Sequence, residues 1–243
     1  MVQRTFLVTG ATKGIGLAIS QRLAAAGDHV VGVARDSLPA FPGSLVSVDL
    51  SNDKASAEEF VRLAKRYSFD GVVNNAGLSK LHRLGELDLA DLDQLMRFNL
   101  HPTINSVQAI LPTLLEKGWG RIVNVTSLVI LGMVNRTAYA ASKAALTSFT
   151  RTWALELAET GITVNSVAPG PVQTELFRRN TPVGSEAERI FLSQIPMRRL
   201  AKPEEIAAAV AFMLSDGASY ITAKLYSSTA ADPSERRRSK KRC

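Results

Sequence analysis

The sequence is poor in the residues on which several kinds of protein site depend. It has one cysteine, Cys243 at the last position, and three histidines among 243 residues. A single cysteine cannot form a disulfide within the chain and suits a reducing compartment, so we expect a cytoplasmic protein. Because there is no cysteine–histidine or multi-histidine cluster, no metal site is expected.

Long hydrophobic runs are also missing. Residues 1–10 lead directly into an apolar strand and a turn, and no segment is apolar for long enough to be a signal peptide or a membrane span. We therefore expect no membrane partner. A hydrophobic content of 46% with 21% charged residues is typical of globular chains, and 243 residues fit one α/β domain with a full core.

Positive charge is unevenly distributed. The net charge is +7, but residues 223–243 hold seven basic and two acidic side chains and so carry +5 of it. The domain before them is close to neutral, and we expect no nucleic-acid partner. One alternative stays open, because the run from Arg236 to Arg242 resembles a nuclear-import or nucleic-acid-binding patch.

Short apolar runs alternate with amphipathic segments along the chain. Strands are predicted at 5–9, 29–34, 45–48, 69–75, 121–126 and 162–167. Helices are predicted through about Ala26, at 53–66, 91–99, 102–117 and 137–157, and from the Pro203 region to about Leu214. This alternation predicts a doubly wound parallel sheet with helices on both faces. The segment 172–194 is of mixed composition and is predicted to cover a site.

The first strand runs into a glycine-rich turn, Gly10 to Gly16, at the start of a helix. A helix N-terminus offers backbone N–H groups to a pyrophosphate, and glycine permits its close approach. After the second strand stands Arg35, where an NAD-binding fold usually has an acid. With Lys13 it would suit a ribose 2′-phosphate, so NADP(H) is predicted over NAD(H). Asp49 and Leu50 end the third strand, where an adenine would lie.

Tyr139 and Lys143 lie four residues apart in the longest predicted helix, and so share one face of it. A lysine charge beside a phenol favours the phenolate and lowers the tyrosine pKa, so Tyr139 would be an acid or base near neutral pH. A packed tyrosine beside a solvated lysine is the alternative. His101, a lone histidine before a proline, is interpreted as structural or solvated.

Taken together and in order, these segments resemble the short-chain dehydrogenase/reductase family, and most closely its 3-oxoacyl-[acyl-carrier-protein] reductases. The resemblance covers residues 5 to about 222, which we expect to form one Rossmann-type domain, 1–222. It rests on Thr9-Gly10, Gly14, Gly16, Asp49, Asn74-Asn75-Ala76-Gly77, Asn99, Ser127, Tyr139, Lys143, Asn165 and Pro169-Gly170.

The resemblance implies hydride transfer between NADP(H) and a carbonyl or secondary alcohol, with a 3-oxoacyl thioester as one candidate substrate. Tyr139 would be the acid or base, Lys143 would lower its pKa and hold the nicotinamide ribose, Ser127 would orient the substrate oxygen, and Asn99 would hold a water. A non-catalytic nucleotide-binding or scaffold protein on the same fold is the alternative. The implied cofactor-binding residues are Gly10, Thr12, Lys13, Gly14, Ile15, Gly16, Arg35, Asp49, Leu50, Asn75, Ala76, Gly77, Tyr139, Lys143, Pro169, Gly170, Val172 and Thr174.

The substrate pocket is predicted between the segments 127–137 and 172–194. Leu128, Ile130, Leu131, Met133 and Phe177 would suit an acyl chain or a ring. The arginines at 178, 179, 198 and 199 are candidates for meeting an acidic carrier protein.

The chain departs from the family after Thr222, where a seventh strand and an Asp-Gly-Gly end are usual. Residues 223–243 form an atypical basic tail instead, so the last edge strand is expected to be missing or altered, and residues after about Thr229 to be disordered. A homodimer or homotetramer is expected, with the tetramer in doubt for this reason. Reading plausible codons one base earlier gives Gly-Gln-Thr-Leu-Phe-Val-Asp-Gly-Gly, and we hypothesise a shifted reading frame. Sequencing the DNA across codon 222 tests this.

Overall fold

The computed structural model of the protein describes residues 3–228. The elements, in chain order, are β1 Thr5–Thr9, α1 Gly14–Ala25, β2 His29–Ala34, β3 Ser44–Ser47, α2 Asp53–Arg66, β4 Gly71–Asn74, α3 Leu89–Lys117, β5 Gly120–Val125, the 3-10 helix η1 Leu128–Leu131, α4 Thr137–Glu156, β6 Ile162–Pro169, α5 Glu175–Asn180, α6 Glu186–Gln194, α7 Pro203–Leu214, the 3-10 helix η2 Asp216–Ala218 and β7 Leu225–Ser228.

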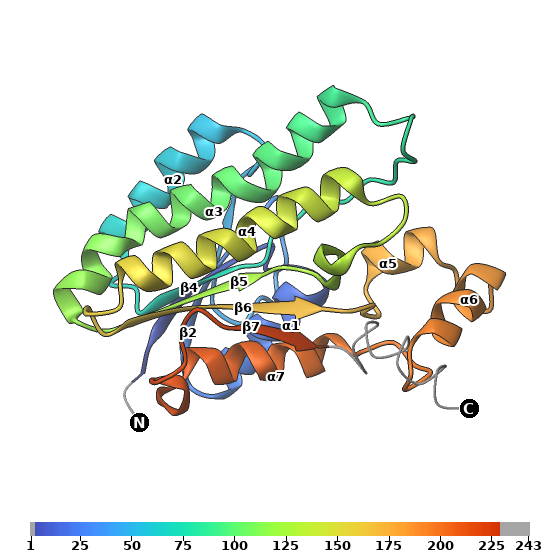
Figure 1. The fold of residues 1–243 in the computed structure, drawn as a ribbon. Coiled ribbons are helices and arrows are strands. Elements are labelled where there is room, and N and C mark those ends of the chain that lie inside the picture. The colour runs from blue at the N-terminus through green and yellow to red at the C-terminus, as the bar shows by residue number, and fades with distance from the viewer. Residues whose placement is uncertain (1–2, 229–243) are drawn as a thin grey trace.

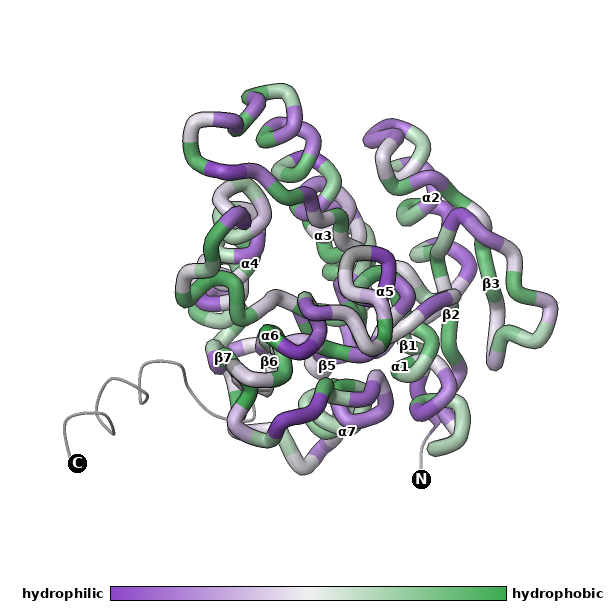
Figure 2. The backbone as a smooth tube through the Cα atoms, turned by 90° about the vertical axis from the view of Figure 1, so that its right-hand side faces the viewer, coloured by the Kyte–Doolittle hydropathy of each residue, from purple (hydrophilic) through white to green (hydrophobic). Residues whose placement is uncertain are grey.

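The strands form one parallel sheet in the order β3-β2-β1-β4-β5-β6-β7. The chain moves outward from β1 to β3, returns to β4 beside β1, and then moves outward in the other direction. Helices α2, α3 and α4 cover one face and α1 and α7 the other, while α5 and α6 lie beyond one end of the strands (Figure 1). Figure 2 looks onto that end. The predicted doubly wound Rossmann-type fold is confirmed.

The strands are apolar throughout because both of their faces are buried. Successive side chains of a strand point to opposite faces, so Val8 packs with Ile19 of α1 and Val210 of α7. Leu7, its neighbour, packs on the other face with α2 and α3 residues such as Phe60. Burial on both faces is the usual reason why strands of a parallel sheet read as continuous hydrophobic runs.

One helix boundary was predicted wrongly. Two helices were expected on either side of His101, but α3 is continuous from Leu89 to Lys117 and includes Pro102 and Pro112. Proline removes a helical hydrogen bond and usually ends a helix, but Pro102 is buried between neighbouring elements, whose packing stabilises the helix. The Nδ1 atom of His101 lies 3.0 Å from the Oδ2 atom of Asp53, at the start of α2. His101 therefore has a structural contact, as predicted.

The last edge strand, expected to be missing or altered, is present with an altered sequence. β7 pairs in parallel with β6, and the main chain before it is already attached, because Ala223 N–H donates to Val164 O at 2.9 Å. Asn165 of β6 donates to Ile221 O at 2.6 Å and accepts from Lys224 N–H at 3.2 Å. Such main-chain contacts tolerate changes of side chain. The sheet therefore extends past the predicted domain end at 222, whereas the predicted disorder after Thr229 falls outside the described residues.

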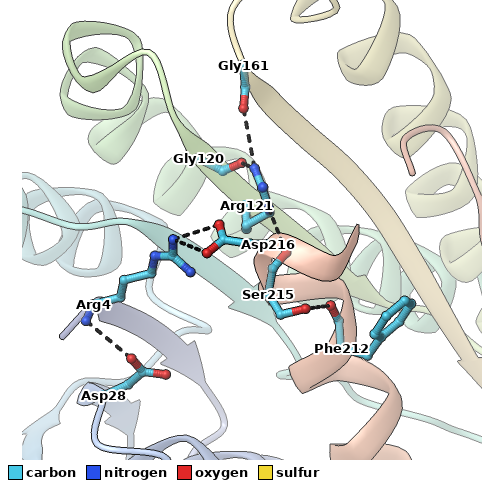
Figure 3. Close-up of polar contacts among 8 residues, drawn as sticks. All are labelled: Arg4, Asp28, Gly120, Arg121, Gly161, Phe212, Ser215 and Asp216. Carbon is cyan, nitrogen blue, oxygen red and sulfur yellow. Dashed lines mark hydrogen bonds and ion pairs between the residues drawn. The ribbon is translucent and has the colours of Figure 1, made fainter. Parts of the chain in front are cut away.

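The opposite edge of the sheet, where the strands begin, is stabilised by two arginines. Arg121 is buried and donates to Gly120 O at 2.8 Å, Gly161 O at 3.3 Å and Ser215 O at 3.4 Å (Figure 3). The ring of Trp119 lies between two guanidinium groups, 4.2 Å from that of Arg121 and 3.9 Å from that of Arg4. The contacts at this edge connect β1, β5 and η2. The candidate site lies at the other edge, where the strands end.

Candidate active site

A single cavity of about 1480 Å³ extends along the carboxyl ends of the strands. It brings together the glycine turn, the segment after β4, Ser127, the first turns of α4 and the turn after β6, as the topology predicts. Of the predicted site residues, Gly16, Asp49 and Asn99 do not line it. The remaining ones do: Gly10, Thr12, Lys13, Gly14, Ile15, Arg35, Leu50, Asn75, Ala76, Gly77, Ser127, Tyr139, Lys143, Pro169, Gly170, Val172 and Thr174.

The glycine turn requires glycine at two positions for two different reasons. Gly10 has a φ of 65°, which side chains rarely adopt, and its N–H donates to Val33 O at 2.8 Å. Gly16 lies inside α1, where an added Cβ would come within 2.1 Å of Gly10 O and 2.6 Å of Asn75 Nδ2. Gly16 thus allows α1 to start directly against the end of β1, so that the helix N-terminus faces the cavity. This geometry fits a dinucleotide pyrophosphate.

The segment after β4 is fixed by a threonine at the end of β1. The hydroxyl of Thr9 accepts from the N–H groups of Asn75 and Ala76, both at 3.0 Å. The Asn75 amide donates to Thr9 O at 3.0 Å. At Gly77, an added Cβ would come within 3.2 Å of Lys143 Nζ. The absence of a side chain at Gly77 therefore lets the lysine approach this wall of the cavity.

The end of β2 carries the charges expected near a ribose. Arg35 is exposed and lines the cavity. Lys13 forms an exposed ion pair with Asp36 at 2.7 Å, which holds the pKa of Asp36 below its usual value. The second positive charge predicted for this place is therefore partly neutralised. Asp49 accepts from Ser51 N–H at 2.9 Å and from the Ser51 hydroxyl at 2.8 Å, so it shapes the loop that contributes Leu50 to the cavity.

Ser127 and Tyr139 both line the cavity, and their side chains are hydrogen-bonded to each other. Ser127 is the residue before η1 and has an extended backbone, while Tyr139 stands in the first turn of α4. Burial raises the pKa of Tyr139, and the hydrogen bond with Ser127 and the charge of Arg136 act in the opposite direction with smaller effect. The predicted lowering of the tyrosine pKa is thus contradicted, because desolvation outweighs the nearby positive charge.

Lys143 shares the face of α4 with Tyr139, as predicted, and its Nζ atom lies 6.0 Å from the centre of the tyrosine ring. The ammonium donates to Val125 O at 2.8 Å, at the end of β5. Burial lowers the pKa of Lys143 to about 8. The alternative of a solvated lysine is therefore wrong, because Lys143 is 3% exposed.

Asn99 lies behind the cavity rather than in its wall. Its Oδ1 atom accepts from Leu78 N–H at 2.7 Å, and its Nδ2 atom donates to Leu78 O at 3.0 Å and to Ser142 Oγ at 2.8 Å. This amide ties the segment after β4 to α4, one residue before Lys143. Its direct structural effect is therefore to position the wall around Lys143.

The segment 172–194 contributes α5 and α6, which lie beyond the carboxyl edge of the sheet (Figure 1). Residues of both helices line the cavity. Thr174 precedes α5, and its methyl group would lie 3.1 Å from a Cβ added at Gly14, so the cover packs against the glycine turn. Four of the five predicted apolar pocket residues line the cavity, whereas Ile130 does not: the lining members are Leu128, Leu131, Met133 and Phe177.

The surface arginines are mostly engaged within the protein. Arg178 pairs with Glu188 and Arg199 pairs with Glu205 at 2.6 Å, while Arg198 donates to Ser193 O at 2.5 Å. Three of the four arginines considered for a carrier protein thus have partners of their own.

Among the residues of the cavity wall that sequence reasoning missed are Arg136, Ser79 and Tyr226. Arg136 and Ser79 line it near Tyr139, and Tyr226 lines it from β7. The spacing of Arg136, three residues before Tyr139 at a helix start, was a usable signal because it predicts the same helix end. No sequence signal pointed to Ser79 or Tyr226, since the position of Ser79 depends on a loop contact and that of Tyr226 on the edge strand.

Two further searches concern the part of the chain that the structure describes. Among residues 3–228, no group of three or more histidine, cysteine, aspartate or glutamate side chains is arranged to hold a metal ion. No helix in the same range is both long and apolar enough to cross a membrane.

Comparison with known proteins agrees with this geometry. A family model described as enoyl-(acyl carrier protein) reductase matches residues 10–227. The 3-oxoacyl-[acyl-carrier-protein] reductase FabG of Vibrio cholerae is 36% identical over 228 residues, which cover 89% of this chain and 91% of that protein.

Two solved structures have the same fold. One is described as an NAD(P)-dependent gluconate 5-dehydrogenase from Beutenbergia cavernae with bound NADP, with a TM-score of 0.87, 32% identity, and coverage of 95% of this chain and 96% of that one. A short-chain dehydrogenase/reductase family protein has a TM-score of 0.84 and 35% identity, and covers 94% of this chain and 96% of its own. The chain therefore belongs to the short-chain dehydrogenase/reductase family, whose members transfer a hydride between a nicotinamide cofactor and a carbonyl or alcohol.

Proposed function

We propose that the protein uses NADP(H) in preference to NAD(H) and interconverts a carbonyl compound and a secondary alcohol, with Tyr139 as the acid or base. The observation that carries this proposal is the meeting of Ser127, Tyr139 and Lys143 in one cavity with the glycine turn. A protein that only binds nucleotide has no need for a half-buried phenol near a buried ammonium.

Tyr139 would donate the proton in the reducing direction. Its raised pKa keeps the phenol protonated before the reaction, as a general acid requires. The Ser127 hydroxyl, already hydrogen-bonded to Tyr139, would hold the substrate oxygen beside the phenol. When bound, NADPH supplies the hydride.

Lys143 would bind the nicotinamide ribose and stabilise the tyrosinate that forms when the proton leaves. Within the described residues its ammonium has one protein acceptor, Val125 O, so further donor positions remain for ligand hydroxyls. Asn99 would support this step by positioning the wall behind Lys143, and the remaining predicted cofactor residues would hold the dinucleotide. Thr174 would lie near the carboxamide.

Arg35 supports the preference for NADP(H). Its exposed guanidinium stands at the end of β2, where the ribose 2′ position is expected, and guanidinium groups bind phosphates with two parallel hydrogen bonds. Lys13 would add to this if the exposed Lys13–Asp36 pair opened, which costs little because such pairs contribute about 0–1 kcal/mol.

The first experiment is calorimetric binding of NADPH and NADH to the full chain and to Arg35→Ser. We expect the variant to lose about 10- to 100-fold in NADPH affinity, with little change for NADH, because one charge-assisted phosphate contact is removed. Equal binding of both nucleotides by the unaltered chain would contradict the proposed preference.

The second experiment is Tyr139→Phe, assayed by NADPH consumption with carbonyl substrates. Turnover should fall by about 10²–10⁴-fold, because a positioned acid is lost, while NADPH affinity should stay within about threefold. Unchanged turnover would exclude the proposed role of Tyr139. Absence of turnover in both proteins, with intact binding, would favour the non-catalytic alternative.

The substrate is proposed to be a small carbonyl or alcohol compound, and a 3-oxoacyl thioester is one candidate because several relatives are named for that activity. A homodimer or homotetramer in the cytoplasm remains our expectation. β7 pairs with β6 but has an altered sequence, so the altered C-terminus is still the reason for doubting the tetramer. Sedimentation analysis of the purified chain measures the assembly directly.

A further inference from the structure

The wall of the cavity contains a cation that the proposed reaction does not use. Arg136 stands at the start of α4, three residues before Tyr139, and lines the cavity with it. Three of the other basic groups of the wall have partners of their own: Lys143 is bonded to the end of β5, Lys13 to Asp36, and Arg199 to Glu205. Arg35 lies at the proposed ribose site, and Arg179 is an exposed residue of α5 in the cover.

Arg136 is held firmly in this position. Its Nη1 atom donates to the Ser79 hydroxyl at 2.6 Å. Its main chain forms a bridge with His82, and His82 N–H donates to Asn135 O at 3.1 Å. The side chain of His82 in turn contacts Asp91 at 2.7 Å, so the loop after β4 is anchored to α3 as well. Because the side chain of Arg136 is bonded to Ser79 and its main chain to the loop after β4, the guanidinium is preorganised for a ligand.

The guanidinium of Arg136 has no carboxylate partner among residues 3–228. Its neighbours are the neutral hydroxyl of Ser79 and the phenol of Tyr139. Burial lowers the pKa of Arg136, and the group that acts in the opposite direction is the Tyr139 phenol and not a carboxylate. A half-buried cation without a counter-charge is costly, and an anion that enters the cavity would offset this cost.

Several exposed apolar side chains line the same cavity as Arg136. Val134 is 85% exposed, Leu131 55% and Leu176 49%, and all three line the cavity. Exposed large apolar side chains at the mouth of a site favour a ligand with an apolar body. Hydroxyl-rich compounds would find few partners there.

From this juxtaposition we propose that the substrate is an oxo acid, or the corresponding hydroxy acid, with an apolar body, whose carboxylate binds Arg136 while its carbonyl oxygen binds Ser127 and Tyr139. The inference rests on the proposed function and narrows its substrate class. A fork-shaped guanidinium and a carboxylate pair through two parallel hydrogen bonds, which would fix the orientation of the carbonyl.

The test compares free acids with their methyl esters. Levulinate and its longer 5-oxo and 6-oxo homologues, each with its methyl ester, are assayed with NADPH on the full chain, Arg136→Gln, Arg136→Lys and Arg151→Gln. Arg151 is an exposed arginine of the same helix that does not line the cavity, and is the matched control. Thermal unfolding of each variant checks that the fold is retained.

In the unaltered chain, at least one acid should have a kcat/KM about tenfold or more above that of its ester. Arg136→Gln should lower kcat/KM for that acid by about 10- to 150-fold, mainly through KM, because a hydrogen-bonded charge pair is lost. The ester should change by less than about threefold. Arg136→Lys should retain part of the preference, and Arg151→Gln all of it.

Two results would overturn the inference. One is a preference for every ester over its acid in the unaltered chain. The other is an equal loss of kcat for acid and ester in Arg136→Gln with a shifted pH profile, which would mean that Arg136 acts on Tyr139 and not on the substrate.

Failure of the proposed function can be recognised separately. If the chain binds no NADPH, or binds it without reducing any of these compounds, calorimetry of acids and esters with the protein replaces the rate assay. Tighter binding of an acid than of its ester, lost in Arg136→Gln, supports the anion site even then. Equal binding of both contradicts it.

Discussion

Replacing Lys143 by methionine should make the folded protein more stable near neutral pH while it removes a residue of the proposed active site. The ammonium is buried, and its pKa falls from 10.5 to about 8 because burial disfavours the charged form. Keeping it charged at about pH 7 therefore costs the folded state about 3 kcal/mol. Methionine is unbranched, of similar length and uncharged, so it can occupy the same space.

The expected gain is smaller than this cost. Val125 O loses its donor, which costs about 1 kcal/mol, so Lys143→Met should raise the free energy of unfolding by about 2 kcal/mol at pH 7. The sign follows from proton binding. Between pH 8 and pH 10.5 the unfolded chain binds the Lys143 proton more tightly than the folded one, so the stability of the unaltered protein rises with pH.

At about pH 9.5 the cost of the charge has fallen to about 1.5 kcal/mol, and the advantage of Lys143→Met should shrink to below 1 kcal/mol. Urea unfolding of both proteins at the two pH values, without nucleotide, measures this. All other titrating groups are shared, so they cancel in the difference. A less stable variant at pH 7, or a difference that does not change with pH, would refute the reasoning.

Two further predictions concern positions where the geometry is tight. Gly16→Ala should lower NADPH affinity at least tenfold and destabilise the fold by about 1–3 kcal/mol, because its Cβ would meet Gly10 O at 2.1 Å. Gly217→Ala is the control: the atom nearest to its added Cβ is 3.4 Å away, so NADPH affinity and stability should change little. Arg121→Ala should reduce the free energy of unfolding by about 3–5 kcal/mol, measured by urea, since three carbonyls lose their donor. Its NADPH affinity should stay the same, because Arg121 lies at the opposite edge of the sheet.

The order of the layers was predictable because short apolar runs alternate with helices. That pattern permits a parallel sheet covered on both faces, and the carboxyl ends of its strands then share one edge. The same reasoning placed Gly10, Ser127 and Tyr139 around one pocket, as the structure does. These conclusions depend on residue type and spacing, which the sequence contains in full.

The points at which helices and strands begin and end were less predictable. The sequence around Pro102 indicates a helix end, yet α3 continues, because neighbouring elements bury it. The tail after Thr222 lacks the pattern of a strand, yet β7 forms. Ala223 N–H donates to Val164 O, and the Asn165 side chain bonds the main chain on either side, so this segment is attached to the edge of β6. In both places tertiary packing outweighs local preference.

By itself the sequence determined the fold class, the family, and the pairing of Tyr139 with Lys143 on one helix face, because these follow from periodicity and motif order. Only the tertiary structure decided the electrostatics of the site. Burial raises the pKa of Tyr139 and lowers that of Lys143, and burial is a property of packing that no spacing encodes. The same holds for Arg136, because only the packing around its guanidinium leaves it without a carboxylate partner among residues 3–228.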